Sequence, residues 1–203
     1  MILATKNRPK AAELAALLSA VADPDLDLIS LADWEERHQA LPEAEEGADS
    51  FAANALLKAR HYARLTGRPA LADDSGLSVA ALRGRPGVLS ARYGGPGLDD
   101  AGRCDFLLEN MAGRFDRRAY FTSVLALARP DGRALCWPGE MPGLIAREKR
   151  GAQGFGYDPI FYYPPLRKTL AQIPAAEKNK ISHRARAARA FLNDARRIRQ
   201  FLN

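Results

Sequence analysis

Two adjacent carboxylates, Asp73 and Asp74, carry the strongest chemical signal in this sequence. They follow the apolar residues 70–72, which predict a short strand that ends at the first acid. Ligands of α/β proteins bind beyond the carboxyl ends of such strands. Paired acids there can hold a hard divalent cation, or one of them can accept a proton from water. Successive strand residues point to opposite faces, so we expect only one of the two carboxylates in a cleft; an Asx-type turn is the structural alternative.

A basic segment near the N-terminus has the composition of a phosphate site. Residues Thr5-Lys6-Asn7-Arg8-Pro9-Lys10 lie between a predicted strand at 2–4 and a predicted helix, for which Asn7 is a suitable N-cap and Pro9 is tolerated in the first turn. The unpaired N–H groups of a helix N-terminus bind anions, and lysines beside them would strengthen that binding. A capped helix with solvated lysines explains the same residues without a ligand.

Further cations lie on two other predicted helices. Asn54 and Lys58 are one turn apart and share a helix face, although an exposed polar face is the default interpretation. Lys178, His183 and Arg184 lie at the start of a basic helix. His183 alone would more often be a cap or a surface residue, but two cations at a helix start favour anion binding.

A glycine-rich stretch, 151–158, completes the set of candidate segments. Its glycines allow the backbone to approach a ligand closely. Phe155 or Tyr157 could stack on a base, unless the ring fills the core instead.

Alternating strands and helices must position these segments. Apolar periodicity and turn residues predict strands at 2–4, 70–72, 77–79, 120–128, 135–137 and 160–163, and helices at about 8–21, 51–65, 101–111 and from 182 onward. Pro130-Asp131-Gly132 predicts the turn of a hairpin, and the acidic stretch 23–49 predicts a connection around one short strand. The predicted fold class is α/β, with a mixed central β-sheet flanked by helices. We expect one domain over residues 1–203, built as two lobes around an active-site cleft.

The composition is that of an ordinary globular protein, and its charge indicates an anionic partner. With 47% hydrophobic and 27% charged residues, the chain is neither disordered, collagen-like nor a small disulfide scaffold. The net charge is +6, and it is concentrated in the basic segment 178–199, whereas 23–49 is strongly acidic. A nucleic-acid-binding module that uses the basic segment is therefore one hypothesis. The alternative is that its front end binds a single nucleotide and its arginines from 186 onward form a solvated helix face.

Cysteine usage and hydropathy bear on the compartment. Cys104 and Cys136 form no disulfide framework and no metal-ligand spacing, so both are predicted to be buried free thiols. No apolar run approaches the ~20 residues of a membrane span, and the N-terminus lacks the layout of a signal peptide. We expect a cytoplasmic protein with no membrane partner.

Taken in order, these segments resemble the inosine/xanthosine triphosphate pyrophosphatase family, which removes non-standard purine nucleotides from the nucleotide pool. The resemblance extends from about residue 2 to residue 192. It rests on residues 4–7 with Lys10 and Glu13, Asn54-Ala55 with Lys58-Ala59, 72–77, 86–87 with 90–93, 154–159, and 177–179 with 182–184.

The resemblance implies Mg²⁺-dependent hydrolysis of ITP, dITP or XTP to the monophosphate and pyrophosphate, which prevents misincorporation into DNA and RNA. Carried over by motif, Asp74 is the general base that activates water for attack at the α-phosphate. Glu46 and Asp74 are the metal contacts, and Asp73 is a supporting carboxylate. The implied phosphate-binding residues are Thr5, Lys6, Asn7, Arg8, Pro9, Lys10, Lys58 and Ser75. The implied base- and ribose-binding residues are Phe155, Gly156, Tyr157, Asp158, Lys178, His183 and Arg184.

One departure from the family pattern leaves the metal contact open. The family usually has Glu-Glu-Thr-Gly before the Asn/Lys helix, whereas this chain has Glu45-Glu46-Gly47-Ala48, so Glu45 is the alternative to Glu46. Donors such as Arg184 would pair with the 6-oxo group of hypoxanthine or xanthine. Adenine has an amino group at this position, so the same donors would be left without an acceptor. That argument does not explain how guanine is excluded.

The resemblance also implies the partners: a small-molecule nucleotide substrate, no nucleic-acid polymer, and a second copy of the chain in a homodimer. The nearest competing hypothesis is a pyrophosphatase of related fold that acts on modified pyrimidine or methylated nucleotides.

Overall fold

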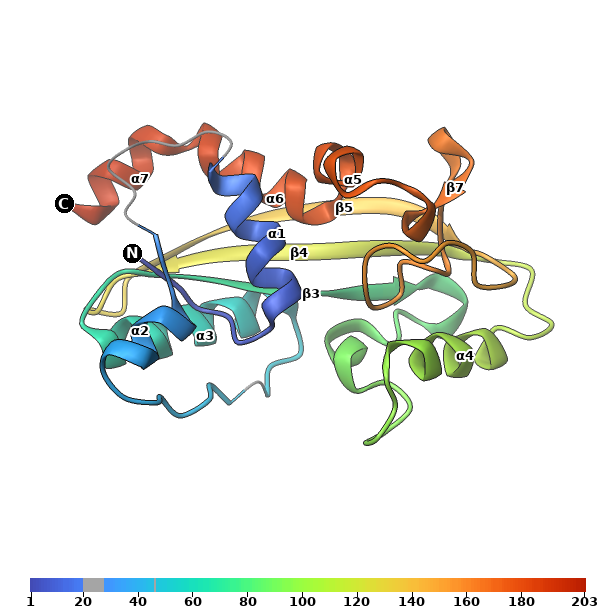
Figure 1. The fold of residues 1–203 in the computed structure, drawn as a ribbon, viewed down its shortest axis with the longest axis horizontal. Coiled ribbons are helices and arrows are strands. Elements are labelled where there is room, and N and C mark those ends of the chain that lie inside the picture. The colour runs from blue at the N-terminus through green and yellow to red at the C-terminus, as the bar shows by residue number, and fades with distance from the viewer. Residues whose placement is uncertain (20–27, 46) are drawn as a thin grey trace. The chain divides into compact units, whose positions relative to one another are not determined.

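The computed structural model describes residues 1–19, 28–45 and 47–203 (Figure 1). The chain divides into two compact units. Unit 1 consists of the segments Met1–Asp74, Ser123–Gly139 and Arg184–Asn203, and unit 2 of Ser75–Thr122 and Glu140–His183. The sequence predicts a single catalytic domain with an active-site cleft, and both points are still predictions.

Strands and helices alternate along the chain. The strands are β1 Ile2–Leu3, β2 Ile29–Ser30, β3 Ala70–Val79, β4 Arg118–Ala128, β5 Ala134–Ile145, β6 Phe161–Tyr163 and β7 Lys168–Thr169. The helices are α1 Arg8–Ser19, α2 Leu31–Arg37, α3 Phe51–Thr66, α4 Asp100–Asn110, α5 Ala175–Ile181, α6 His183–Asn193 and α7 Ala195–Leu202. Short 3-10 helices lie at Ala80–Leu82, Gly87–Arg92, Pro164–Leu166 and Leu170–Gln172.

The strands form one mixed sheet in the order β2-β1-β3-β4-β5-β6-β7. β1 is parallel to both β2 and β3, whereas β6 is antiparallel to β5 and β7. β4 and β5 are neighbours joined by the predicted turn, where the Arg129 amide donates to the Arg133 carbonyl at 2.9 Å. The predicted fold class, a mixed sheet with flanking helices, is confirmed.

Alternate strand residues of unit 1 pack into two different hydrophobic cores. Ile2 and Ala72 pack with α2 and α3, whereas Leu3 and Leu71 pack with α1, α6 and α7. Figure 1 shows these two groups of helices on opposite faces of the strands. The two-residue period of a strand thus decides which helix each side chain meets.

Helix α3 begins and ends where the sequence predicts. The Ser50 hydroxyl accepts a hydrogen bond from the Ala53 amide at 3.2 Å, and Gly67 closes the helix in the left-handed conformation (φ 64°). The Ser50 hydroxyl thus satisfies an N–H group that the start of a helix leaves unpaired, and Gly67 adopts the left-handed conformation without the strain of a side chain.

Unit 2 has its own core around α4. Cys104 and Leu107 of this helix pack with Leu77, Met141 and Phe161 from the strands, and each of the five side chains is fully buried.

The prediction that a strand ends at Asp73 is wrong, because β3 continues to Val79. Lysines from two helices neutralise the two acids, so these polar residues do not interrupt the strand.

Two further predictions need correction. The acidic stretch contains the expected short strand, β2, but also a helix, α2, which the sequence analysis missed; Ser30 caps it by accepting from the Asp33 amide at 3.0 Å. The single C-terminal helix is divided into α6 and α7 at Asp194, whose Oδ2 accepts from the Trp137 indole at 2.9 Å.

Within the three described ranges, no helix combines the length and the hydropathy needed to cross a membrane.

Candidate active site

Asp73 and Asp74 occupy opposite faces of β3, as strand alternation predicts. Asp73 shares the face of Leu71, and Lys10 of α1 places its Nζ 3.6 Å from Asp73 Oδ2. Asp74 shares the face of Ala72, and Lys58 of α3 donates to Asp74 Oδ1 at 3.0 Å. The Asp73 side chain is fully buried and that of Asp74 is 8% exposed. Each carboxylate is therefore held in a low-dielectric place beside its own lysine.

Asp73 is fixed on several sides at once. The Ser123 hydroxyl donates to Oδ1 at 2.5 Å, and the Nε of Arg184 lies 3.7 Å from Oδ2. Burial alone raises the pKa of Asp73, but Lys10, Arg184 and Ser123 together outweigh it and hold that pKa well below its usual value. Asp73 is therefore ionised at neutral pH, which suits an electrostatic anchor better than a proton acceptor.

Glu13 of α1 is a member of this group that the sequence analysis did not assign to the site. Arg184 Nη1 donates to Glu13 Oε2 at 2.8 Å, and both side chains are almost fully buried. Glu13 lies three residues after Lys10 on the same helix face, and this spacing could have predicted that it belongs to the site. We call the group Lys10, Glu13, Lys58, Asp73, Asp74 and Arg184 the carboxylate cluster; within it three cations balance three carboxylates.

Burial also acts on Lys10. Desolvation lowers its pKa, and the nearby Asp73 opposes that shift. A partly desolvated ammonium ion gains more from an added negative charge than a solvated one does. Lys10 is therefore suited to an anionic ligand.

The residues before Lys10 divide between capping and exposure. Asn7 Oδ1 accepts from the Lys10 amide at 3.0 Å, which confirms the predicted N-cap, and Thr5 Oγ1 accepts from the Asn7 amide at 3.2 Å. Arg8 and Pro9 are exposed in the first turn of α1.

Lys6 is engaged outside the carboxylate cluster. Its Nζ donates to the Leu41 carbonyl at 3.0 Å and lies 3.3 Å from Glu35 Oε1. Its predicted contact with phosphate would have to compete with these two interactions.

A second group of candidate residues lies in unit 2. Lys178 of α5 donates to Asp158 Oδ2 at 2.6 Å, with both side chains less than a tenth exposed. The same Lys178 Nζ lies 4.9 Å from the centre of the Phe155 ring, as in a cation–π contact. The Phe155 amide donates to Asp158 Oδ2 at 3.0 Å. We call Phe155, Asp158 and Lys178 the aromatic cluster.

Backbone geometry builds this cluster. Gly154 has φ +77°, and a Cβ at that position would overlap the Asp158 carboxylate. The Gly156 amide donates to Asp100 Oδ2 at 2.7 Å. A side chain at position 154 would therefore displace the acid that holds Lys178.

Tyr157 fills the core of unit 2, the alternative left open for this ring. It is 5% exposed, and its hydroxyl donates to the Ser90 carbonyl at 2.8 Å. Of the two aromatic candidates for stacking on a base, Phe155 is the half-buried one.

His183 and Ser75 complete the predicted set in unit 2. The His183 ring stacks on Phe121 with centroids 4.7 Å apart and planes 11° from parallel. It is 2% exposed, which is contrary to a surface position, and it is the first residue of α6. Ser75 is half-buried in β3.

The carboxylate cluster fits a magnesium ion bound together with a substrate. In the part of the chain that the structure describes, no three His, Cys, Asp or Glu side chains form a metal-binding group. Mg²⁺ usually takes one or two carboxylates plus phosphate oxygens rather than an all-protein cage, and Asp74 offers such a carboxylate. The predicted contact Glu46 lies outside the described residues; Glu45 is exposed.

The two cysteines differ. Cys104 is buried, and burial raises the pKa of its thiol to about 12. Cys136 is exposed, so the prediction that both thiols are buried is wrong for it. It lies on β5, where alternate residues face solvent.

The arginines that follow Arg184 in the sequence are mainly exposed to solvent. Arg189, Arg196, Arg197 and Arg199 are exposed and Arg186 is half-buried. The predicted solvated face of the C-terminal helix is confirmed.

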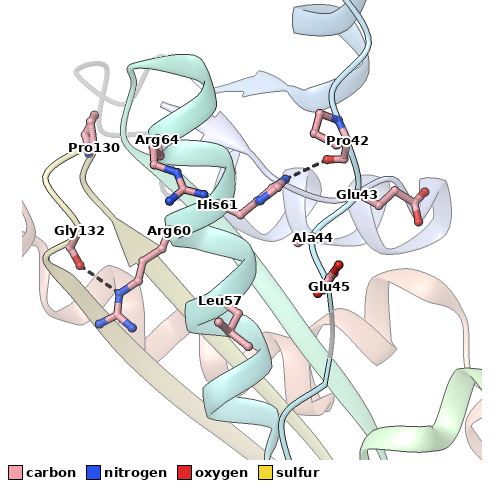
Figure 2. A pocket seen from close by; sticks show the side chains of 10 residues that line it. All are labelled: Pro42, Glu43, Ala44, Glu45, Leu57, Arg60, His61, Arg64, Pro130 and Gly132. Carbon is pink, nitrogen blue, oxygen red and sulfur yellow. Dashed lines mark hydrogen bonds between the residues drawn. The ribbon is translucent and has the colours of Figure 1, made fainter.

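Unit 1 also contains a cavity of about 640 Å³ on the outer side of α3. Its walls are the segment from Pro42 to Glu45, the α3 side chains Leu57, Arg60, His61 and Arg64, and the hairpin turn at Pro130 and Gly132 (Figure 2). His61 Nε2 lies 2.9 Å from the Pro42 carbonyl, and Arg60 Nε donates to the Gly132 carbonyl at 3.0 Å.

The fold and these clusters define a class: an α/β protein whose paired buried carboxylates and cations suit a polyphosphate ligand. Residues 1–194 match the model of the Ham1 family, and the chain belongs to that family.

Similar proteins cover nearly the whole chain. A dITP/XTP pyrophosphatase of Desulfotalea psychrophila is 46% identical over 202 residues, which are 100% of this chain and 87% of the relative. A dITP/XTP pyrophosphatase of Thermus thermophilus is 48% identical and covers 95% of this chain and 89% of its own length. The solved structure of a HAM1 protein from Coxiella burnetii has a TM-score of 0.84 at 42% identity, and covers 97% of this chain and 98% of that one.

Proposed function

We propose that this chain is a nucleoside-triphosphate pyrophosphatase that hydrolyses ITP, dITP and XTP to the monophosphate and pyrophosphate. The observation that carries the proposal is the pair of adjacent buried carboxylates in β3, each beside a lysine from a different helix. Membership of the Ham1 family and relatives named dITP/XTP pyrophosphatase support the same activity.

Asp74 is the proposed catalytic residue. Its carboxylate would accept a proton from the water that attacks the α-phosphate, while pyrophosphate leaves. Asp73 is less suited to this role, because Lys10, Arg184 and Ser123 stabilise its ionised form. Asp73 would instead hold Lys10 and Arg184 in place.

Magnesium is the proposed cofactor, with Asp74 and one of the acids Glu45 and Glu46 as its protein ligands. Bound there, it would supply positive charge for the phosphate oxygens. Lys58 and Lys10 would bind the phosphates, together with Ser75 and the segment from Thr5 to Pro9.

The aromatic cluster is the proposed site for the base and ribose. Phe155 offers a half-buried ring for stacking, which is worth about 1–3 kcal/mol for a base on an aromatic side chain. The remaining residues proposed to bind the base and the sugar are Gly156, Tyr157, Asp158, Lys178, His183 and Arg184. Donors among them would pair with a 6-oxo group and would face the amino group of adenine unfavourably.

Two further proposals concern assembly and compartment. We propose a homodimer, which light scattering coupled to size exclusion would test. We also propose a cytoplasmic location, where the nucleotide pool is available to the enzyme.

A substrate panel tests the function. Pyrophosphate release is measured with Mg²⁺ for ITP, dITP, XTP, GTP, ATP and modified pyrimidine nucleotides. We expect kcat/KM for ITP and XTP to exceed that for ATP at least about 100-fold, the size of a loss caused by unpaired polar groups. Equal rates on ATP would contradict the proposal, and a preference for modified pyrimidines would favour the competing hypothesis.

A further inference from the structure

The two peptide groups that flank Phe155 are each held by a carboxylate. The Phe155 amide donates to Asp158 Oδ2 at 3.0 Å, and the Gly156 amide donates to Asp100 Oδ2 at 2.7 Å. Asp158 belongs to the same glycine-rich stretch, whereas Asp100 is the first residue of helix α4 and lies 56 positions before Gly156. Because a peptide group is planar, holding these two groups restricts φ and ψ of Phe155, and with them the direction of its Cα–Cβ bond.

Helix α4 holds Gly156 a second time, through its carbonyl. The Cys104 thiol donates to the Gly156 oxygen at 3.4 Å. Burial raises the pKa of Cys104 to about 12, so the thiol keeps its proton at neutral pH and stays a donor. Cys104 lies one turn after Asp100 on the same face of α4, so this helix face binds both backbone groups of Gly156.

Asp100 is not needed to cap its own helix. Asp99 is the N-cap, and its Oδ1 accepts from the Gly102 amide at 2.8 Å. Asp100 Oδ1 instead accepts from Arg103 Nη2 at 2.8 Å, while Oδ2 accepts from the Gly156 amide. Burial raises the pKa of Asp100, but the hydrogen bonds from Arg103 and Gly156 outweigh it and lower that pKa. Asp100 is thus ionised at neutral pH, and a charged acceptor makes the stronger hydrogen bond.

The Phe155 ring depends on this backbone for its position. Among the described residues of unit 2, the buried core around α4 includes Tyr157 but not Phe155. The ring is half-buried, with Lys178 Nζ 4.9 Å from its centre. Its orientation therefore depends more on the two held peptide groups and on Lys178 than on core packing.

We infer that Asp100 is a positioning residue for base binding, because it holds the Gly156 amide and so orients the Phe155 ring on which the base stacks. This inference rests on the proposed function, which assigns the base to Phe155. A ring that is already oriented spares the binding step the entropy of ordering the loop. Loss of Asp100 therefore weakens binding of the base and leaves binding of the phosphates unchanged.

Matched variants of two adjacent acids test this role. Asp100→Ala removes the acceptor of the Gly156 amide, and Asp100→Asn keeps an oxygen that can accept from it. Asp99→Ala is the control, because it removes the N-cap hydrogen bond of the same helix, which is made to Gly102 and not to the loop. Calorimetry measures equilibrium binding of two probes: IMP, which has a base, and inorganic tripolyphosphate, which has none. Kinetics of ITP hydrolysis and the midpoint of thermal unfolding are measured on the same preparations.

We expect the dissociation constant of IMP to rise about five- to tenfold in Asp100→Ala, with a smaller rise in Asp100→Asn, whereas that of tripolyphosphate changes less than about twofold. KM for ITP should rise with the dissociation constant of IMP, and kcat should stay near the wild-type value. Asp99→Ala should lower the unfolding midpoint and leave the affinity for both probes unchanged.

An Asp100→Ala protein that binds IMP as tightly as the wild type would overturn the inference, and so would an equal loss of affinity for IMP and tripolyphosphate. The Asp100 side chain is 49% exposed, so we expect the variant to fold; if it does not, Arg103→Leu, which removes the cation that orients Asp100, decides by the same two affinities. ITP hydrolysis by the wild-type protein tests the proposed function separately. A wild type that hydrolyses ITP, with an Asp100→Ala variant of unchanged IMP affinity, refutes only the inference.

Discussion

The carboxylate cluster and the aromatic cluster hold their charges by different means. In the carboxylate cluster every charge comes from a strand or a helix: Asp73 and Asp74 from β3, Lys10 from α1 and Lys58 from α3. In the aromatic cluster the central acid, Asp158, lies in a glycine-rich loop and outside the strands and helices. Regular elements fix every charge of the first cluster, whereas loop backbone fixes the acid of the second, which pairs with Lys178 of α5.

Because of this difference, we expect substitutions in the two clusters to affect different properties of the protein. Within the carboxylate cluster Asp73 lies near both Lys10 and Arg184, so removal of one of these cations leaves the other to compensate. Asp158 is paired with Lys178 at 2.6 Å, and both are buried. We therefore expect changes in the carboxylate cluster to act mainly on catalysis, and changes in the aromatic cluster to act strongly on stability.

The largest expected effect is that of Asp74→Asn on turnover. Removing a general base typically costs 10²–10⁴-fold, so we expect kcat for XTP to fall about that much. The unfolding free energy should fall less than in a variant of the Lys178–Asp158 pair, because the amide still accepts from Lys58 and both side chains are somewhat more exposed. Steady-state kinetics and denaturant unfolding of the same preparation measure both quantities. A kcat near the wild-type value would remove Asp74 from the catalytic role.

Lys178→Met should affect stability most. It removes the cation that lies 2.6 Å from Asp158, an acid that is 2% exposed, and breaking a buried pair in this way costs about 3–5 kcal/mol. The double variant Lys178→Met/Asp158→Asn should recover part of that loss, because no charge remains unpaired. Urea unfolding at pH 7 provides the measurement.

A matched control lies in the same unit. Lys149 pairs with Asp105 at 2.7 Å, but their side chains are 40% and 53% exposed. Lys149→Met should therefore cost much less unfolding free energy than Lys178→Met, because solvent screens an exposed ion pair. Equal losses in Lys178→Met and Lys149→Met would contradict the view that burial makes the aromatic cluster sensitive.

Local patterns were sufficient to predict much of the carboxylate cluster. Strand alternation placed Asp73 and Asp74 on opposite faces, and the capping preference of Asn7 placed the start of α1. Both depend on residues within a few positions of one another, which is the range over which sequence patterns are informative.

Long-range pairing explains what the sequence did not show. β3 runs through Asp73 because lysines from α1 and α3, distant in sequence, neutralise its acids. Asn54 is buried because its amide meets the backbone of Ala48 in an irregular segment. The lysines lie outside a window of neighbouring residues around the acids, whereas Ala48, six residues before Asn54, lies in an irregular segment that no periodicity predicts. Propensity therefore failed where a tertiary partner changed the cost of burying a polar group.

The smallest expected effect is a change in how stability depends on pH, and it comes from Asp73. Burial raises the pKa of Asp73, but Lys10, Arg184 and Ser123 hold it below the value of the unfolded chain. A carboxyl group with a lowered folded-state pKa stabilises the protein above its unfolded pKa near 4, and that contribution is lost as the pH falls through the folded-state value. Between pH 6 and pH 3 the wild type should therefore lose about 1 kcal/mol more unfolding free energy than Asp73→Asn, because pH 3 lies only about one pH unit below the unfolded pKa and one unit is worth about 1.4 kcal/mol. Urea unfolding across this range gives the two curves; parallel curves would mean that Asp73 is not the anchored carboxylate of its cluster.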